Sequence, residues 1–329
     1  MSETGLIAPS EPPVVAAVST RPTLSPHRAR RPDSPPHTAR LPVLPSRLLA
    51  LAHRIRAGRR IACVLILAAI CAVVQSVLIL LPGRMKIRFA RFFWACIARQ
   101  IGLRVRVLGT LAGGIRAESD AAQRPVIFVA NHSSWADVAA IGGVVPAVFV
   151  AKDQVRTWPV ISTVARLGRT IFVSRQRGTT GRERDDMATR IRRQDNLILF
   201  PEGTSSDGSR VLPFLSSFFA IAKPQPRGET PIEAAFPTPL VQPVSIVYDR
   251  LDGLPVGRAR RSVFAWYGDM DLAPHIWRLT QWRSMRVTIM LHPPLDPDAF
   301  PSRKALAVAA WQAVADGAAT LRQNSPVPE

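Results

Sequence analysis

Three short apolar runs in the middle of the chain are each followed at once by polar residues. The runs cover residues 126–130, 170–174 and 197–200. Unbroken apolar runs of this length predict buried β-strands. Side chains that follow such strands gather at one edge of an α/β sheet, and that edge is where such sheets build their sites. The pattern therefore predicts an α/β protein with a polar site on one rim of its sheet.

The same kind of pattern predicts the other elements of this body. Further strands are expected at 103–108 (an edge strand), 148–152, 240–247, 263–267 and 286–291. Helices are expected at 158–167, ending at Gly168, and at 180–194, which is highly charged and solvated. A last, Ala-rich amphipathic helix covers 302–323, with Ser302 as its N-cap, and is expected to pack on the body.

The N-terminal part of the chain has a different character. Residues 61–81 are apolar and uncharged, apart from the polar Gln75 and Ser76, and are long enough to cross a bilayer. Arginines flank the stretch on both sides, so the positive-inside rule gives no orientation. Two alternatives stay open, a true span and a helix held in one leaflet with both ends on the cytoplasmic side. Residues 89–100 are amphipathic and suit a membrane surface, the alternative being a core helix.

These shifts in composition divide the chain. Residues 1–47 are rich in Pro, Ser, Arg and Ala, show no apolar period and are predicted to be disordered, without a signal-peptide layout. Membrane-anchoring helices are expected over 48–100, a catalytic domain over 101–298, and a C-terminal helix and tail over 299–329.

The charge of the chain limits the classes of partner that it is expected to bind. The formal net charge is +20, and most of the basic residues are arginine. Two explanations for the excess of arginine stay open. One is a codon preference for arginine, and the other is that the protein lies on anionic lipid and binds an acidic carrier protein. Nucleic acid is not expected, because the arginines are scattered and no aromatic residues are interleaved with them. Cys63, Cys71 and Cys96 show no metal-ligand spacing, and no metal is expected.

The turn after the first run carries the clearest chemistry. His132 and Asp137 are spaced so that the carboxylate approaches one imidazole nitrogen and leaves the other facing outward, as in a general base. Ser133 or Ser134 is expected to cap the helix that follows. Neither serine lies in a Gly-x-Ser-x-Gly elbow, so neither is expected to be a nucleophile.

These motifs together resemble the lysophospholipid (glycerolipid) acyltransferase family. The matching blocks are Asn-His-x4-Asp at 131–137, Ile-Phe-Val-x-Arg at 171–175, Phe-Pro-Glu-Gly-Thr at 200–204 and a fourth block at 241–246. The resemblance covers about residues 85–295. Within the family, the stretches 200–208 and 266–271 are similar to those of the bacterial lyso-ornithine lipid O-acyltransferases.

The resemblance implies a fold, a reaction and roles for several residues. The fold is a mixed β-sheet flanked by helices behind an N-terminal membrane segment. A fatty acyl chain moves from acyl carrier protein or coenzyme A to a lysolipid hydroxyl by direct attack, without a cofactor. His132 is the base and Asp137 orients it, while the acceptor-binding residues are expected to be Arg175, Glu202, Gly203, Thr204 and Ser205. Glu202 either contacts an acceptor hydroxyl or braces the arginine. The expected location is the cytoplasmic face of a bacterial inner membrane.

One position departs from the family pattern. Relatives with a phosphate acceptor commonly carry Arg where this chain has Ser205. Losing a guanidinium removes a bidentate phosphate partner. The departure favours lyso-ornithine lipid over 1-acylglycerol 3-phosphate, the acceptor of the enzymes that make phosphatidic acid. A membrane lipid-binding protein without catalysis is the alternative from another class, and the intact pair of His132 and Asp137 argues against it.

Overall fold

The computed structural model describes residues 46–113, 124–152, 162–165, 168, 170–173, 180–223 and 238–323. The predicted N-terminal tail therefore lies almost wholly outside the described residues. So do most of the helix expected at 158–167, of which 162–165 are helical, and Arg175.

Eight strands and several helices make up this part of the chain. The strands are β1 (Leu103–Leu108), β2 (Val126–Ala130), β3 (Ala147–Lys152), β4 (Ile171–Val173), β5 (Asn196–Leu199), β6 (Leu240–Leu251), β7 (Leu254–Pro255) and β8 (Met285–Leu291). The α-helices are α1 (Ser46–Leu80), α2 (Met85–Gln100), α3 (Ala136–Gly142), α5 (Thr180–Arg192), α6 (Leu272–Thr280) and α7 (Arg303–Arg322). Short 3-10 helices are η2 (Ser216–Ile221), η4 (Arg258–Val263) and η5 (Pro297–Ala299).

The strands form one mixed, mostly parallel sheet, in the order β1-β8-β6-β2-β5-β3-β4, with β7 paired to β6. From β6 to β4 every neighbouring pair is parallel, whereas β8 runs antiparallel to β6 and parallel to β1. The predicted α/β class and the edge position of the strand at 103–108 are confirmed.

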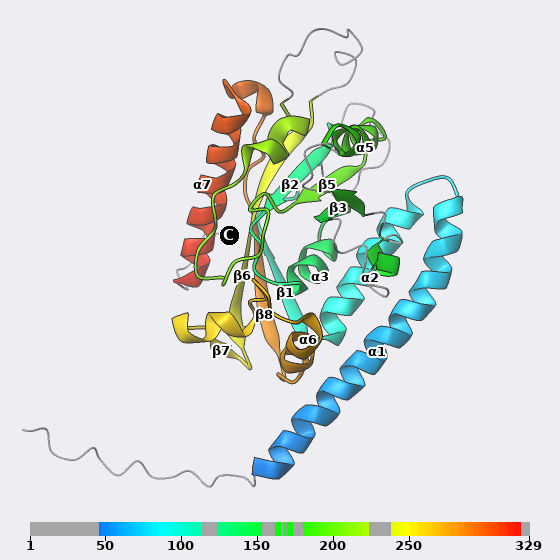
Figure 1. The fold of residues 1–329 in the computed structure, drawn as a ribbon, viewed down its shortest axis with the longest axis vertical. Coiled ribbons are helices and arrows are strands. Elements are labelled where there is room, and N and C mark those ends of the chain that lie inside the picture. The colour runs from blue at the N-terminus through cyan, green and yellow to red at the C-terminus, as the bar shows by residue number, and fades with distance from the viewer. Residues whose placement is uncertain are drawn as a thin grey trace, which may run out of the picture. The chain divides into compact units, whose positions relative to one another are not determined.

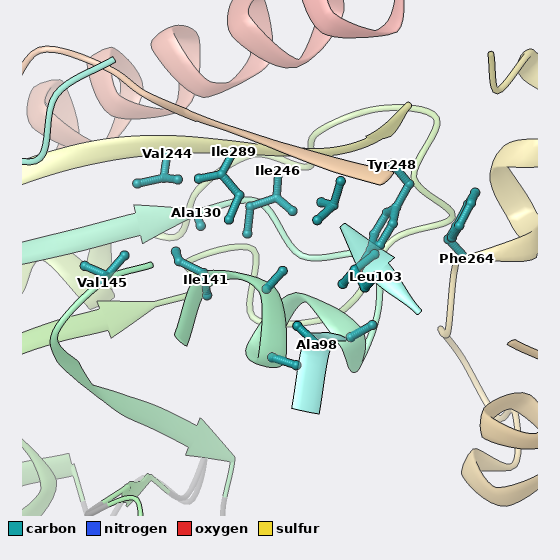
Figure 2. Close-up of a cluster of buried hydrophobic side chains, with 14 of the residues drawn as sticks. Ala98, Leu103, Ala130, Ile141, Val145, Val244, Ile246, Tyr248, Phe264 and Ile289 are labelled. Carbon is teal, nitrogen blue, oxygen red and sulfur yellow. The ribbon is translucent and has the colours of Figure 1, made fainter. Parts of the chain in front are cut away.

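The central strand β2 is buried on both faces, as expected of a parallel strand between helical layers. Val126, Phe128 and Ala130 pack with residues of α2 and α3, and Figure 2 shows Ala130 and Ile141 within this layer. Ile127 and Val129 face the other way and pack with residues of α7. The sheet therefore separates α2 and α3 from α7, as Figure 1 shows.

The predicted strand at 263–267 is wrong. This segment follows η4 and runs as irregular chain between η4 and α6. Its apolar residues Phe264 and Ala265 are buried, and the N–H of Trp266 donates to the carbonyl of Ser133 at 2.8 Å. Its apolar sequence predicts a strand because the segment is buried, but its backbone bonds to the loop that follows β2 and not to a strand.

α1 and α2 form a hairpin whose two ends both attach to the sheet domain. Arg56 of α1 donates to the carbonyl of Gln281, and Arg60 donates to the carbonyls of Thr280, Trp282 and Arg283, just after α6. α2 returns along α1 to pack on α3 and leads directly into β1. Beyond Arg60, α1 leaves a row of large apolar side chains exposed: Leu65, Ile66, Ile70, Val73 and Val77.

Gln75, a polar residue within the apolar run, supports the hairpin directly. Its side-chain amide donates to the carbonyl of Lys86 on α2 at 3.0 Å. Ser76, the other polar residue of the run, donates back to the carbonyl of Ala72 within α1 at 2.8 Å. Both polar side chains of the run are thus hydrogen-bonded to backbone carbonyls, one between the two helices and one within α1.

Candidate active site

The two polar turns identified in the sequence follow neighbouring parallel strands. β2 pairs with β5 in a register that places Val129 opposite Leu199, so His132 and Glu202 emerge on the same rim of the sheet. The backbone N–H of His132 donates to Oε1 of Glu202 at 2.8 Å. Arg175 lies outside the described residues. β4 ends two residues before it and runs parallel to β3, so its carboxyl end lies on this same side.

His132 has the geometry of a general base. Its Nδ1 lies 3.0 Å from Oδ2 of Asp137, and its side chain is 19% exposed. A carboxylate only accepts hydrogen bonds, so Nδ1 carries the proton and Nε2 keeps a free lone pair. The ring of Phe200 stacks on the imidazole, with the ring centres 4.2 Å apart. The carboxylate and the aromatic ring together fix the orientation of the base.

Asp137 is held by more partners than the sequence suggested. Its carboxylate is fully buried, and Oδ2 also accepts the backbone N–H groups of Ser133 at 2.7 Å and Ser134 at 2.9 Å. Oδ1 accepts the hydroxyl of Tyr248 at 2.6 Å. Four donors on one buried carboxylate keep it in place and offset the loss of water.

The predicted capping role of the serines needs correction. The residue preceding α3 is Trp135, which provides no side-chain cap, and Asp137 is the second residue of the helix. Ser134 Oγ does accept the N–H of Ala136 at 3.3 Å, but the carboxylate of Asp137 takes the N–H groups of both serines. The charge of Asp137 makes it the stronger acceptor for these donors.

Glu202 braces the backbone of the site. Its two carboxylate oxygens accept the N–H groups of His132 and of Leu212, the latter at 3.1 Å, and the residue is only 6% exposed. Burial raises the pKa of Glu202 to about 8, with the N–H groups of His132 and Leu212 opposing the shift and Asp137 adding to it. The contacts of Glu202 within the described residues position His132, and the two roles expected for it, towards an acceptor hydroxyl or towards Arg175, stay predictions.

We expect Glu202 to give the fold a pH dependence. Between the ordinary carboxyl pKa and about 8, the folded state holds a proton that the unfolded chain has released. The contribution of this group to stability is therefore full at low pH and is lost as the pH rises towards 8. Glu202→Gln should flatten the slope of unfolding midpoint against pH between about 5 and 8, while lowering stability by about 1–3 kcal/mol because one N–H loses its acceptor.

The matched control for this experiment is Asp316→Asn, which changes an exposed carboxylate on α7. Thermal unfolding in detergent, followed by circular dichroism at several pH values, compares the two variants with the parent chain. The Asp316 variant should keep the parent slope. A Glu202→Gln variant that also keeps it shows that Glu202 does not titrate in this range.

The rest of the Pro-Glu-Gly-Thr turn lies where the sequence places it. Gly203 has φ 69°, a conformation that side chains disfavour, and its N–H closes the turn onto the carbonyl of Phe200. Thr204 is exposed and Ser205 is partly exposed, and no hydrogen bond joins either side chain to the described residues. Ser206 donates its N–H to the carbonyl of His132 at 2.9 Å. The turn is thus tied to the base while Thr204 and Ser205 stay available to a ligand.

Two residues of the site did not emerge from sequence reasoning as contributors. Tyr248 lies two and four residues beyond Ile246 and Val244 on the same face of β6, so the two-residue period of a strand could have pointed to it. Its pKa is raised, chiefly by burial and also by Asp137, which keeps the phenol a proton donor. Asn131 exchanges two hydrogen bonds with the backbone of Ile246, at 2.7 and 2.9 Å, and so extends the pairing of β2 with β6 up to the base.

A carboxylate-oriented imidazole on the rim of such a sheet is the arrangement that a general base needs to take a proton from an attacking group. Comparison with known proteins then specifies the class. Residues 115–247 match the Acyltransferase family. The chain is 37% identical over 234 residues to the lyso-ornithine lipid O-acyltransferase of Brucella abortus, covering 71% of this chain and 82% of that protein. It is 28% identical over 187 residues to the 1-acyl-sn-glycerol-3-phosphate acyltransferase of Neisseria meningitidis, covering 56% and 66%.

The fold agrees with this assignment. The crystal structure of the 1-acyl-sn-glycerophosphate acyltransferase of Thermotoga maritima superposes with a TM-score of 0.52 at 22% identity, covering 86% of this chain and 97% of that one. The chain belongs to the acyltransferase family and is an O-acyltransferase. Because the chain belongs to a family of enzymes and His132 is bonded to Asp137, the alternative of a lipid-binding protein without activity is not supported.

Proposed function

We propose that this enzyme acylates the free hydroxyl of a lysolipid, and that the lysolipid is lyso-ornithine lipid. The observation that carries the reaction is the bonded pair of His132 and Asp137 on the rim of the sheet. Four relatives named lyso-ornithine lipid O-acyltransferase, from 34% to 37% identical, support the acceptor. Ser205, in the place of the arginine that phosphate-acceptor relatives carry, supports it from the site.

The geometry supports a transfer in two bond changes. Nε2 of His132 accepts the proton of the acceptor hydroxyl while its oxygen bonds to the thioester carbonyl carbon. The tetrahedral intermediate then collapses, the carbon–sulfur bond breaks, and the imidazolium gives the proton to the leaving thiolate. Asp137 stabilises the imidazolium between the two steps, because its buried carboxylate already accepts Nδ1–H. The products are an ester and a free thiol, on carrier protein or coenzyme A.

The acceptor assignment is tested at Ser205. A charge-assisted hydrogen bond contributes about 1.5–3 kcal/mol, or about a ten- to hundred-fold preference. We expect the parent enzyme to have a higher kcat/KM for lyso-ornithine lipid than for 1-acylglycerol 3-phosphate, and Ser205→Arg to shift the ratio towards the phosphate acceptor by that factor. Val308→Arg, at an exposed position on α7 outside this turn, is the matched control for an added charge.

Both acceptors are assayed side by side with one acyl donor. A parent enzyme that clearly prefers 1-acylglycerol 3-phosphate contradicts the ornithine-lipid assignment and favours synthesis of phosphatidic acid, the activity named for the Neisseria relative. Arg175 then has to bind the phosphate unaided, and Arg175→Ala raises the KM for that acceptor.

We further propose that the enzyme sits on the cytoplasmic face of a bacterial inner membrane, with its helical hairpin in one leaflet. Within the described residues, one helix, Arg47–Leu80, is long and apolar enough to cross a bilayer. Yet Arg60 bonds to the sheet domain before the apolar stretch, and α2 brings the chain back to that domain after it. Both ends of the hairpin therefore lie on one side, which favours insertion from that side over a span.

A further inference from the structure

Two arginines far apart in the sequence line one open cleft beside the base. The space in and above the cleft, including the part open to solvent, is about 440 Å³, and Arg261 of η4 and Arg322 of α7 contribute to its wall. Asn131 and Ser133, the residues on either side of His132, also line it, as does Tyr248, which bonds to Asp137. The cleft is therefore adjacent to the catalytic loop, although His132 itself is not part of its wall.

Neither guanidinium is matched by an anion. Across the described residues, the guanidinium of neither Arg261 nor Arg322 makes a hydrogen bond or an ion pair within 4 Å. Arg322 is only partly exposed, and its pKa is lowered by burial and by the charge of Arg261, with Glu202 and Asp207 opposing the shift. Placing two like charges in one cleft costs free energy, and a bound oxyanion between them offsets that cost.

The carboxylates near the cleft already have partners. Asp249 lines it, but both of its oxygens accept from Arg286, and Thr288 adds a bond at 3.2 Å. Asp207 is an exposed residue that accepts the N–H and hydroxyl of Ser209. Further exposed arginines lie within a few residues of the lining residues Gly208 and Arg261 in the chain: Arg210, Arg258 and Arg260.

The position of the cleft indicates which substrate brings the anion. α7 covers the sheet face opposite to α2 and α3, and Arg322 is the last residue of α7. The membrane hairpin lies on the α2 side, as Figure 1 shows. With the hairpin in the membrane, as proposed above, a lipid acceptor is expected from the hairpin side, which leaves the α7 side to a water-soluble donor. Acyl carrier protein and coenzyme A both present a phosphate at the end of a pantetheine arm.

We propose that the Arg261–Arg322 cleft binds the phosphate of the pantetheine arm of the acyl-thioester donor. The two guanidiniums hold the phosphate, the arm passes Ser133, and the thioester reaches Nε2 of His132. The further exposed arginines add long-range attraction for an acidic carrier protein. The assignment rests on the proposed acyl transfer and adds to it where the donor binds.

The test compares donors that differ only by the phosphate. S-acyl-4′-phosphopantetheine and S-acyl-pantetheine are used as donors for the full chain, for the double variant Arg261→Gln/Arg322→Gln, and for Lys304→Gln, an exposed charge at the other end of α7. The parent enzyme should favour the phosphorylated donor at least about ten-fold in kcat/KM. The double variant should lose this preference with the KM for the lysolipid unchanged, and Lys304→Gln should keep it.

Several results overturn the assignment. One is a parent enzyme that uses both donors equally, and another is a preference that survives in the double variant. A higher KM for the lysolipid with unchanged donor preference places the acceptor carboxylate in the cleft instead. Acyl carrier protein and coenzyme A thioesters, assayed in parallel, then separate the two donor types. Calorimetric titration of coenzyme A into the parent and the double variant needs no acceptor. It therefore decides the phosphate site, by loss or persistence of binding, even if the acceptor proposed above is wrong.

Discussion

Replacing His132 by Ala should reduce acyl transfer by about 10²–10⁴-fold, because that is the typical contribution of a positioned general base. The loss should fall on kcat, since the base accepts a proton during the reaction. The variant loses the ring contacts with Asp137 and Phe200, but Asp137 keeps its bonds from Ser133, Ser134 and Tyr248. The backbone N–H of His132 keeps its bond to Glu202 in the variant, so the protein should fold and should partition with membranes as before. Initial rates with acyl donor in excess, on protein purified from membranes, measure the loss.

Two neighbouring substitutions separate the base from its supports. Asp137→Asn keeps an oxygen for the N–H groups but loses the charge that stabilises the imidazolium, so it should approach the loss seen for His132→Ala. Tyr248→Phe removes one donor to Oδ1 and should cost much less. A His132→Ala enzyme that keeps more than about a hundredth of the activity contradicts the role of base.

Deleting residues 1–82 should release the enzyme from membranes or make it aggregate. The deletion removes α1, whose Arg56 and Arg60 bond to the carbonyls after α6, and whose Val64 and Leu67 pack on the core. It also leaves α2 without its partner helix. Fractionation of cells into membrane and soluble protein, with activity measured in each, follows the effect.

The control for this deletion is the removal of residues 1–45 alone. Their composition provides no apolar core, so activity and membrane binding should stay near those of the full chain. The membrane assignment is lost if a chain lacking residues 1–100 is both soluble and fully active.

The pattern of apolar and polar residues along the chain was sufficient to predict most of the fold. Buried parallel strands are read directly from apolar runs, so β2, β5 and β8 were predicted within one residue at each end. Ser302 was identified as the cap of α7, and its hydroxyl accepts the N–H of Ala305. The prediction of a strand after η4 was wrong because a buried apolar residue such as Phe264 gives the same sequence pattern in a strand and in a buried loop.

The candidate site was predictable in its chemistry but not in its supports. The spacing of His132 and Asp137 is local, and it gave the pair that the structure places 3.0 Å apart. The bond from Tyr248 to Asp137 and the bond from the N–H of His132 to Glu202 join residues 70 or more positions apart, and no local pattern encodes them. The pair of Arg261 and Arg322 is equally non-local, because only the meeting of η4 with the end of α7 brings the two side chains to one cleft.

The attachment of Arg60 gives α1 a fixed phase. Each helical residue turns the chain by about 100° and advances it by about 1.5 Å, so the bonds to Thr280, Trp282 and Arg283 determine which way every later side chain of α1 points. Inserting one residue after Arg60 would turn Leu65 and the exposed apolar row a quarter of a turn or more away from the lipid, without changing the composition of the helix. For a hairpin held in the membrane as proposed above, the number of residues between Arg60 and the apolar row therefore sets the direction in which the sheet domain faces the bilayer.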